Sequence, residues 1–296
     1  MKNIGNIAGT MESFLQATIE KKARIEEKRQ RQIQELESKE SAKLIQLPLW
    51  AETKRGTPNS ALRGALFAAI LGKDRKALKR ELISNEENLQ IRFSGWQLDQ
   101  SDLNVWETVL HMARSQNLGH KIRFSAHGFL KTMGKTTGKK DHEWLKDAFS
   151  RLTGCCVEIT HGDCTYGGNL IEFLRNEREG HYEITINPKI ARLYTAGYTA
   201  ICWEDRKKIG KRPLALWLHG YIASHAKLYP TKISTLHRLS GSANNNMRDF
   251  KRYLKNALTL LKKLNLINDF WFEDDLVHIR NIPSESQKRY LAHQNK

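Results

Sequence analysis

Hydrophobic residues recur at helix and strand spacing over two stretches of the 296-residue chain, and both stretches share one order of elements. In the first, from about Ser101 to Asn187, Leu103, Trp106 and Leu110 recur three and four residues apart, which predicts an amphipathic helix. The same reading predicts further helices over Ala126–Met133 and Lys139–Leu152, and strands over Lys121–Phe124, Cys156–Thr160, Tyr166–Leu174 and His181–Asn187.

The second stretch, from about Arg212 to Ile282, repeats this plan. Pro213 can open a helix, and a short helix is predicted over Thr235–Leu239. A long helix follows over Asn246–Leu264, and then two strands, Leu266–Phe272 and Leu276–Arg280, joined as a hairpin. Helix, strand, helix, helix and hairpin is the order of a winged helix, a relative of the helix-turn-helix. The sequence therefore predicts an α+β protein with two winged-helix domains in tandem.

The residues before these stretches look poorly suited to a packed core. Ile19–Lys43 is rich in charge with a weak apolar stripe, which favours a solvated helix or disorder. Ala51–Asn59 has the composition of a linker or loop. We therefore predict three parts: a flexible charged tail and linker over residues 1–57, a first winged-helix domain over 58–202, and a second over 203–296.

The long helix carries the clearest candidate site. Phe250, Leu254 and Leu261 fall on one side of a helical projection, and cations fall on the other. Asn246 is a good N-cap and Asp249 lies where a capping-box partner would be. A basic helix face of this width suits a DNA major groove, although a solvated surface helix is the alternative. The predicted DNA-binding residues are Asn246, Arg248, Lys251, Arg252, Lys255, Asn256, Lys262 and Lys263.

The charge of the chain supports a polyanionic partner. Lys and Arg number 49 against 32 Asp and Glu, a formal net charge of +17. Residues 203–296 hold 18 basic and 8 acidic groups, a net charge of +10, so the excess lies mainly in the last third. No apolar run approaches the length of a membrane span and no signal peptide is evident, so we expect a cytoplasmic protein without membrane contact.

Signatures of catalysis and metal binding are weak. The four cysteines form no zinc-type spacing, so we expect no metal and no cofactor. Gly134-Lys135-Thr136 resembles the end of a phosphate loop but lacks its first glycine. No His-x-His pair accompanies a tyrosine nucleophile, and Ser224-His225 adjoin on a predicted helix, where their side chains diverge. We therefore expect no enzymatic activity.

A short apolar segment interrupts the polar tail at Gln46-Leu47-Pro48-Leu49-Trp50. This pattern resembles the pentapeptide that binds the bacterial sliding clamp, and it predicts clamp contacts by Gln46, Leu47, Leu49 and Trp50. Packing of the segment against its own domain is the alternative.

Two features of the first domain have open interpretations. Ala61–Leu71 is more apolar than one buried helix face requires, which favours a dimer contact over a core position. A weaker basic face suits either phosphate contact or a protein–protein contact, and it comprises Lys135, Lys139, Lys140, Lys146 and Arg151 interrupted by Asp141, Glu143 and Asp147.

Several long stretches of this sequence resemble the TrfA-type plasmid replication initiators, namely Pro58–Ile70, Leu98–Thr108, Pro213–Gly220 and Ala223–Ala226. The resemblance implies tandem winged helices that bind repeated origin sites (iterons) in double-stranded plasmid DNA as monomers. It implies a homodimer as the inactive form, opening of an A·T-rich element, and recruitment of the host sliding clamp and replicative helicase. Single-stranded A·T-rich origin DNA is a further candidate ligand. The hairpin tip Glu273–Asp275 is acidic, which disfavours phosphate contact there.

The predicted function is therefore plasmid replication initiation without catalysis. A winged-helix transcriptional regulator of a plasmid is the closest alternative, and a DNA-nicking enzyme is the alternative from another class.

Overall fold

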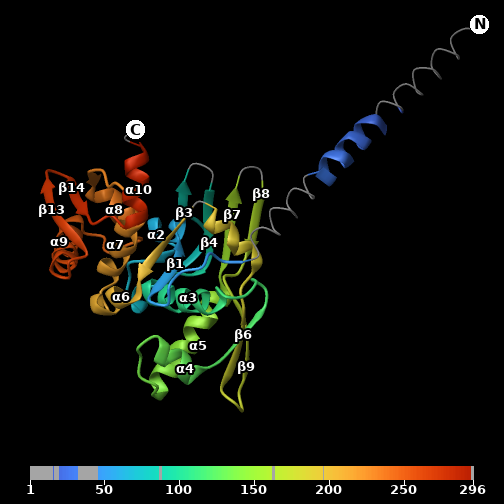
Figure 1. The fold of residues 1–296 in the computed structure, drawn as a ribbon, viewed down its shortest axis with the longest axis horizontal. Helices are drawn as coiled ribbons and strands as arrows, with labels where there is room; N and C mark the ends of the chain where they lie inside the picture. Colours follow the sequence, from blue (N-terminus) through green and yellow to red (C-terminus); the bar gives the residue numbers. More distant parts are fainter. Residues whose placement is uncertain are drawn as a thin grey trace, which may run out of the picture. The chain divides into compact units, whose positions relative to one another are not determined.

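The computed structural model of the chain describes residues 16, 20–32, 46–86, 89–161, 164–195 and 197–294 (Figure 1). The chain divides into two units, Met1–Ile45 and Gln46–Lys296. In the first unit, residues 20–32 form a helix whose side chains are all exposed, which agrees with the weak apolar stripe of this segment. Residues 1–15, 17–19 and 33–45 of the predicted tail lie outside the described residues.

The first half of the second unit contains two antiparallel sheets and three main helices. One sheet has the strand order β3 (Ala77–Glu86), β4 (Leu89–Trp96), β7 (Cys156–His161), β8 (Cys164–Gly168), and the other has the order β6 (Lys121–Ser125), β10 (His181–Thr185), β9 (Glu172–Asn176). The helices are α3 (Gln100–Ala113), α4 (Ala126–Thr132) and α5 (Lys139–Gly154). Aromatic contacts join them: the Phe129 ring stacks on Phe124 with centroids 4.8 Å apart, and the tilted Phe149 and Tyr182 rings have centroids 4.9 Å apart.

Two strand predictions in this half need correction. The predicted strand Tyr166–Leu174 is two strands, β8 and β9, which belong to different sheets. Gly167 and Gly168 lie where the first of them ends, and glycine weakens a continuous strand. The β3–β4 hairpin was not predicted, because β3 is mostly exposed, carries two irregularities in its pairing and shows no regular alternation.

The second half has the predicted order of elements. Its elements are α6 (Trp203–Ile209), α7 (Pro213–Ala223), β12 (Thr231–Lys232), α8 (Ile233–Leu239), α9 (Met247–Lys263), β13 (Ile267–Glu273), β14 (Leu276–Asn281) and α10 (Glu285–Gln294). The predicted bounds of the long helix are confirmed to within one residue. One core holds this half together and includes Trp217, Leu236, Leu254 and Val277 from four different elements. Helix α10 was not predicted and buries none of its residues.

The two halves share a pattern of strand pairing as well as an order of elements. In the second half the strand before the short helix, β12, pairs with β14, the second strand of the hairpin. In the first half β6 pairs in the same way with β10, the second strand of the β9–β10 hairpin. The first half differs by carrying β7 and β8 between its last helix and its hairpin.

The prediction of a linker or loop over Ala51–Asn59 is wrong. Residues Lys54–Pro58 form strand β1, which pairs antiparallel with β11 (Tyr198–Cys202) along its whole length. Arg55 and Thr57 are buried, and the Thr57 hydroxyl donates to the Glu107 carboxylate at 2.7 Å. The buried side chains of this strand are polar, and hydrogen-bond partners such as Glu107 lie far away in the sequence. The segment therefore has the composition of a loop although it is a strand. Residues 46–57 therefore belong to the second unit and not to a tail.

The apolar segment Ala61–Leu71 lies between the two halves of this unit. It forms the short helix α2 (Asn59–Arg63), strand β2 (Phe67–Ala68), which pairs in parallel with β5 (Leu98–Asp99), and then leads to the 3-10 helix η1 (Gly72–Asp74). The Trp217 indole donates to the Gly64 carbonyl at 3.1 Å, and the Ala69 amide donates to the Ser240 carbonyl at 2.7 Å. Leu66 and Ile70 are buried within the chain, so the prediction that this segment forms a dimer contact is wrong and the core position is correct.

Helix α6 ties the two halves together through a buried charge. Arg206 donates from Nε to the Asn104 side chain at 2.8 Å, and Nε lies 3.4 Å from the Glu107 carboxylate. Burial raises the pKa of Glu107, while the nearby Arg206 opposes that rise. Breaking a buried pair of this kind is strongly destabilising because it leaves one charge buried alone. The boundary predicted at residue 203 therefore crosses a packed contact.

Candidate nucleic-acid interface

Helix α9 presents two chemically different faces. Phe250, Leu254, Leu258 and Leu261 are buried in the core of the second half. The side chains predicted to bind DNA are all exposed, as the helical projection indicates: Asn246, Arg248, Lys251, Arg252, Lys255, Asn256, Lys262 and Lys263. The apolar face fixes the helix on the protein, and the cationic face is free to meet a ligand.

The start of α9 is fixed by a chain of asparagine hydrogen bonds. The Asn246 side chain accepts from the Arg248 amide at 2.9 Å, so its N-cap role is confirmed and its amide oxygen is occupied. The Asn246 amide in turn donates to the Asn244 side chain at 2.9 Å. His237 of α8 donates from Nε2 to the Asn244 carbonyl at 2.7 Å, and its ring lies edge-on to Phe250. The turn before the helix is therefore held by the helix that precedes it.

Three of the predicted cations already contact the protein. Arg252 pairs with Asp249 at 2.9 Å, so Asp249 serves this ion pair in addition to its place in the first turn. Lys262 pairs with Asp269 at 2.6 Å and its hydrogen bond lowers the pKa of that carboxyl. Lys251 donates to the Asp274 carbonyl at the hairpin tip at 3.2 Å. Exposed pairs of this kind contribute about 0–1 kcal/mol, so a phosphate or base can replace them.

The other cations of this face are available. Arg248, Lys255 and Lys263 have no side-chain partner among the residues that the structure describes, and neither does the Asn256 amide. They lie along the exposed side of a helix of 17 residues. The exposed face of α9 therefore carries three cations without a side-chain partner and three that already contact the protein.

The β13–β14 hairpin adds an aromatic side chain, Trp271, that is not among the residues predicted to bind DNA. Trp271 is 43% exposed and stacks on His278 across the hairpin, with ring centroids 4.7 Å apart. The Arg280 guanidinium lies 5.9 Å from the Trp271 ring centroid. The signal in the sequence was the alternation along β13, where Phe270 and Phe272 pack against the core and Trp271 points to the opposite face.

The weaker basic face of the first half is only partly available. Arg151 forms an ion pair at 2.7 Å with Asp102, whose side chain is fully buried, so it stabilises the fold. Lys146 pairs with Glu143 at 3.1 Å. Lys139 and Lys140 are exposed at the start of α5.

The segment Gln46–Trp50 packs on its own domain. Trp50 is only 9% exposed, and its indole donates to His111 Nδ1 at 3.0 Å. Leu47 is also buried, whereas Leu49 is 71% exposed. Gly56 makes room for the indole, since a Cβ atom there would lie 2.3 Å from it. Of the predicted clamp-binding residues, Gln46 and Leu49 are exposed and the aromatic anchor is not.

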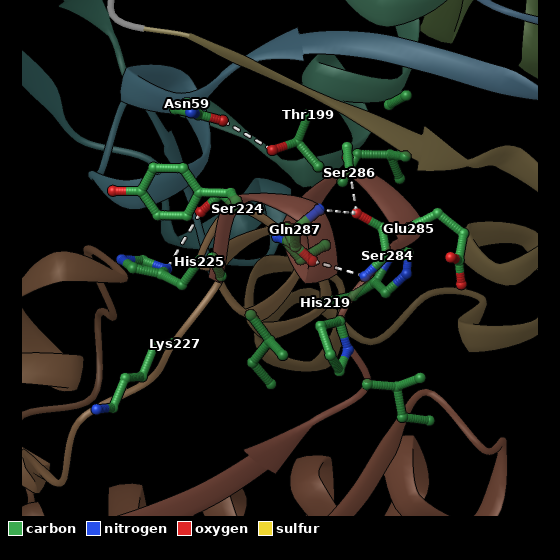
Figure 2. A pocket seen from close by; sticks show the side chains of 18 of the residues that line it. Asn59, Thr199, His219, Ser224, His225, Lys227, Ser284, Glu285, Ser286 and Gln287 are labelled. Carbon is green, nitrogen blue, oxygen red and sulfur yellow. Dashed lines mark hydrogen bonds between the residues drawn. The ribbon is translucent and has the colours of Figure 1, made fainter. Parts of the chain in front are cut away.

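A cavity of about 1240 Å³ lies between the end of α7, strand β11 and α10 (Figure 2). Gln287 of α10 closes one side by donating to the Ala223 carbonyl at 2.8 Å. His219 lines the cavity, and burial lowers its pKa to about 3. His225 Nδ1 lies 2.6 Å from the Tyr221 carbonyl and therefore carries a proton, so it cannot accept one from the neighbouring Ser224.

Among the described residues, no group of three or more His, Cys, Asp or Glu side chains could hold a metal ion. No helix in the same ranges combines the length and the apolar character that a bilayer crossing needs.

Comparisons with known proteins find relatives in sequence and in fold. The plasmid replication initiator protein TrfA of Escherichia coli is 27% identical over 259 residues, which cover 82% of this chain and 67% of that protein. A crystal structure of domains 2 and 3 of RctB is similar in fold, with a TM-score of 0.50 and 13% identity over 76% of this chain and 98% of that one. The profile of the TrfA protein family matches residues 8–281. Since this match spans most of the sequence, the chain belongs to the TrfA family of plasmid replication initiators.

Proposed function

We propose that this initiator binds repeated sites in double-stranded plasmid origin DNA through α9, which enters the major groove. The observation that carries the proposal is the division of α9 into a buried apolar face and an exposed row of cations with a capped first turn. Arg248, Arg252 and the residues beside them lie in the first turns, where a recognition helix usually meets base edges. Lys262 and Lys263 lie near the last turn and suit backbone phosphates.

The proposal includes a winged-helix fold for each half. Its support is the order α7, β12, α8, α9 and the β13–β14 hairpin, repeated as α3, β6, α4, α5 and the β9–β10 hairpin with the same strand pairing. In this assignment α8 is the first helix of the motif and α9 the second. The second half makes the base contacts, because α5 has fewer unpaired cations than α9.

Protection mapping tests the proposal. Purified protein is incubated with the DNA that flanks its own gene, and the protected positions are mapped. We expect repeated protected sites of equal length with a fixed spacing, each occupied by one protein molecule. Protection without any repeat, or at a single palindromic site, favours the transcriptional regulator instead.

Recruitment of host proteins is part of the same proposal. We infer helicase recruitment, opening of an A·T-rich element with capture of its single strand, and storage as an inactive homodimer from the resemblance to the TrfA-type initiators. Clamp binding by Gln46–Trp50 requires this segment to leave its position, because Leu47 and Trp50 are buried there. Leu49 is the apolar residue of the segment that a clamp meets first. The chain has no catalytic role in this scheme.

A further inference from the structure

A second, smaller pocket of the second half is separate from the proposed DNA contact. It has a volume of about 290 Å³ and lies between three elements: the loop that joins α7 to β12, the β13–β14 hairpin, and α10 with the turn before it. None of the described residues that line it belongs to α9. We call it the hairpin pocket, and its lining includes Lys227, Leu228, Trp271, Ile279, Arg280 and Leu291.

Side-chain hydrogen bonds fix the walls of the hairpin pocket. The Asn281 side chain donates to the His225 carbonyl at 3.0 Å, which holds the loop after α7 beside β14. The Gln287 side chain donates to the Ala223 carbonyl at 2.8 Å, which holds α10 at the end of α7. The pocket is therefore formed before a ligand arrives, and this lowers the entropic cost of binding.

The hairpin pocket combines an apolar floor with a cationic rim. Leu228, Ile279 and Leu291 are half-buried and supply aliphatic surface. Lys227 and Arg280 are exposed, and the described lining residues include no carboxylate. An apolar group with negative charge beside it is therefore the complementary ligand.

Neither cation of the rim has a carboxylate partner within the described part of the chain. Asp269 lies opposite Arg280 across the hairpin, but its carboxylate is bound to Lys262 at 2.6 Å. The Glu273 carboxylate lies 3.1 Å from His278 Nε2. Two cations without a counter-charge attract an anionic partner, most strongly at low salt.

Exposed apolar side chains accompany the pocket. Trp271 lines it, and the exposed residues Tyr229, Ile282 and Tyr290 are each next in sequence to a lining residue. Lys227 Nζ lies 5.1 Å from the Tyr229 ring centroid. Contacts between proteins are enriched in aromatic residues and arginine, and exposed apolar groups mark such contacts.

We propose that the hairpin pocket binds a short acidic segment of a partner protein. A large apolar side chain of the segment packs on the aliphatic floor, and the carboxylates beside it pair with Lys227 and Arg280. A volume of about 290 Å³ is at the lower end of the range for ligand pockets, so it suits a few side chains of a peptide rather than a folded domain. The site goes beyond the proposed DNA contacts and does not depend on them.

Single-stranded DNA is the other polyanion that aromatic and cationic side chains can bind. Its bases need free aromatic faces on which to stack. Trp271 already stacks on His278 with an angle of 14° between the rings, and the Arg280 guanidinium lies 5.9 Å from the Trp271 ring centroid. The remaining floor is aliphatic, so the observations favour a peptide.

A selection from a random-peptide phage library on the immobilised full chain tests the inference. We expect the enriched peptides to share a large apolar residue with aspartate or glutamate beside it. Fluorescence anisotropy then measures the affinity of the most enriched peptide, synthesised with a fluorescein label. Lys227→Glu/Arg280→Glu replaces two attractions by two repulsions and should weaken its binding by about 10-fold or more. Leu291→Glu should abolish the binding because it places a carboxylate on the apolar floor.

The matched control is Lys73→Glu/Lys79→Glu, which makes the same change of charge at two exposed residues of the first half. We expect the control to bind the peptide as the wild type does, and circular dichroism checks that all variants are folded. The inference is overturned if no peptide is enriched, if the enriched peptides are not acidic, or if the pocket variants bind as tightly as the control. It is also overturned if the pocket variants keep the peptide but lose a labelled thymidine oligonucleotide, because the pocket would then bind a nucleic-acid strand.

Discussion

Replacing Trp50 by alanine tests whether the segment Gln46–Trp50 is part of the domain. The Trp50 indole is 9% exposed, lies with its ring centroid 6.3 Å from that of Tyr198, and donates its N–H to His111. Loss of a buried tryptophan side chain costs about 3–5 kcal/mol of unfolding free energy. Leu49, one residue away, is 71% exposed, and its replacement by alanine should change the unfolding free energy by less than about 0.5 kcal/mol.

Urea denaturation followed by circular dichroism measures both variants. With a urea slope of about 1–3 kcal/mol per M, the Trp50→Ala midpoint should fall by on the order of 1 M or more, and the Leu49→Ala midpoint should stay in place. The reasoning is refuted if both variants unfold at the wild-type midpoint, because the segment would then be a free strap whose indole is unpacked in solution.

Three further predictions concern the charge of the protein and its action on DNA. Lys262→Ala should lower affinity for origin and random duplexes alike and flatten the salt slope by about one unit, measured by anisotropy; a loss confined to origin DNA contradicts a phosphate contact. His219 has a folded pKa of about 3 against 6.5 when unfolded, so the unfolded state binds its proton first. The unfolding free energy should therefore decline as the pH falls below 6.5, by up to about 1.4 kcal/mol per pH unit. In denaturation experiments at several pH values, His219→Gln should show a shallower decline than the wild type. Equal declines would contradict the claim that burial keeps His219 neutral. Supercoiled origin plasmid incubated with the protein and Mg²⁺ should stay supercoiled on a gel, and a nicked product would mean an enzyme.

The sequence predicted the long helix α9 of the second half well because this helix is amphipathic and its charged residues face water. In α9 the period of 3.6 residues separates Phe250 and Leu254 from the cations without ambiguity. The Asn246 cap was also predictable, since its partner amides lie two and three residues away. Local signals of this kind do not depend on the rest of the fold.

Features that depend on distant partners were not predictable. The sequence of strand β1 has the composition of a loop, because the hydroxyl of its buried Thr57 finds its hydrogen-bond partner in Glu107, 50 residues away. Trp50 looks like an exposed anchor because its position depends on His111 and on the absence of a side chain at Gly56.

The claim that α9 reads base sequence is tested most directly by Arg252→Ala, measured by anisotropy on an origin duplex and on a random duplex at one salt concentration. Arg252 lies in the first turns of the helix, exposed and held by a weak pair with Asp249. If it contacts a base edge, the variant should lose about 1–3 kcal/mol of binding to origin DNA and much less to random DNA, so that the ratio of the two affinities falls by about 5- to 150-fold. Equal losses on both duplexes, with the ratio unchanged, would contradict base reading by α9.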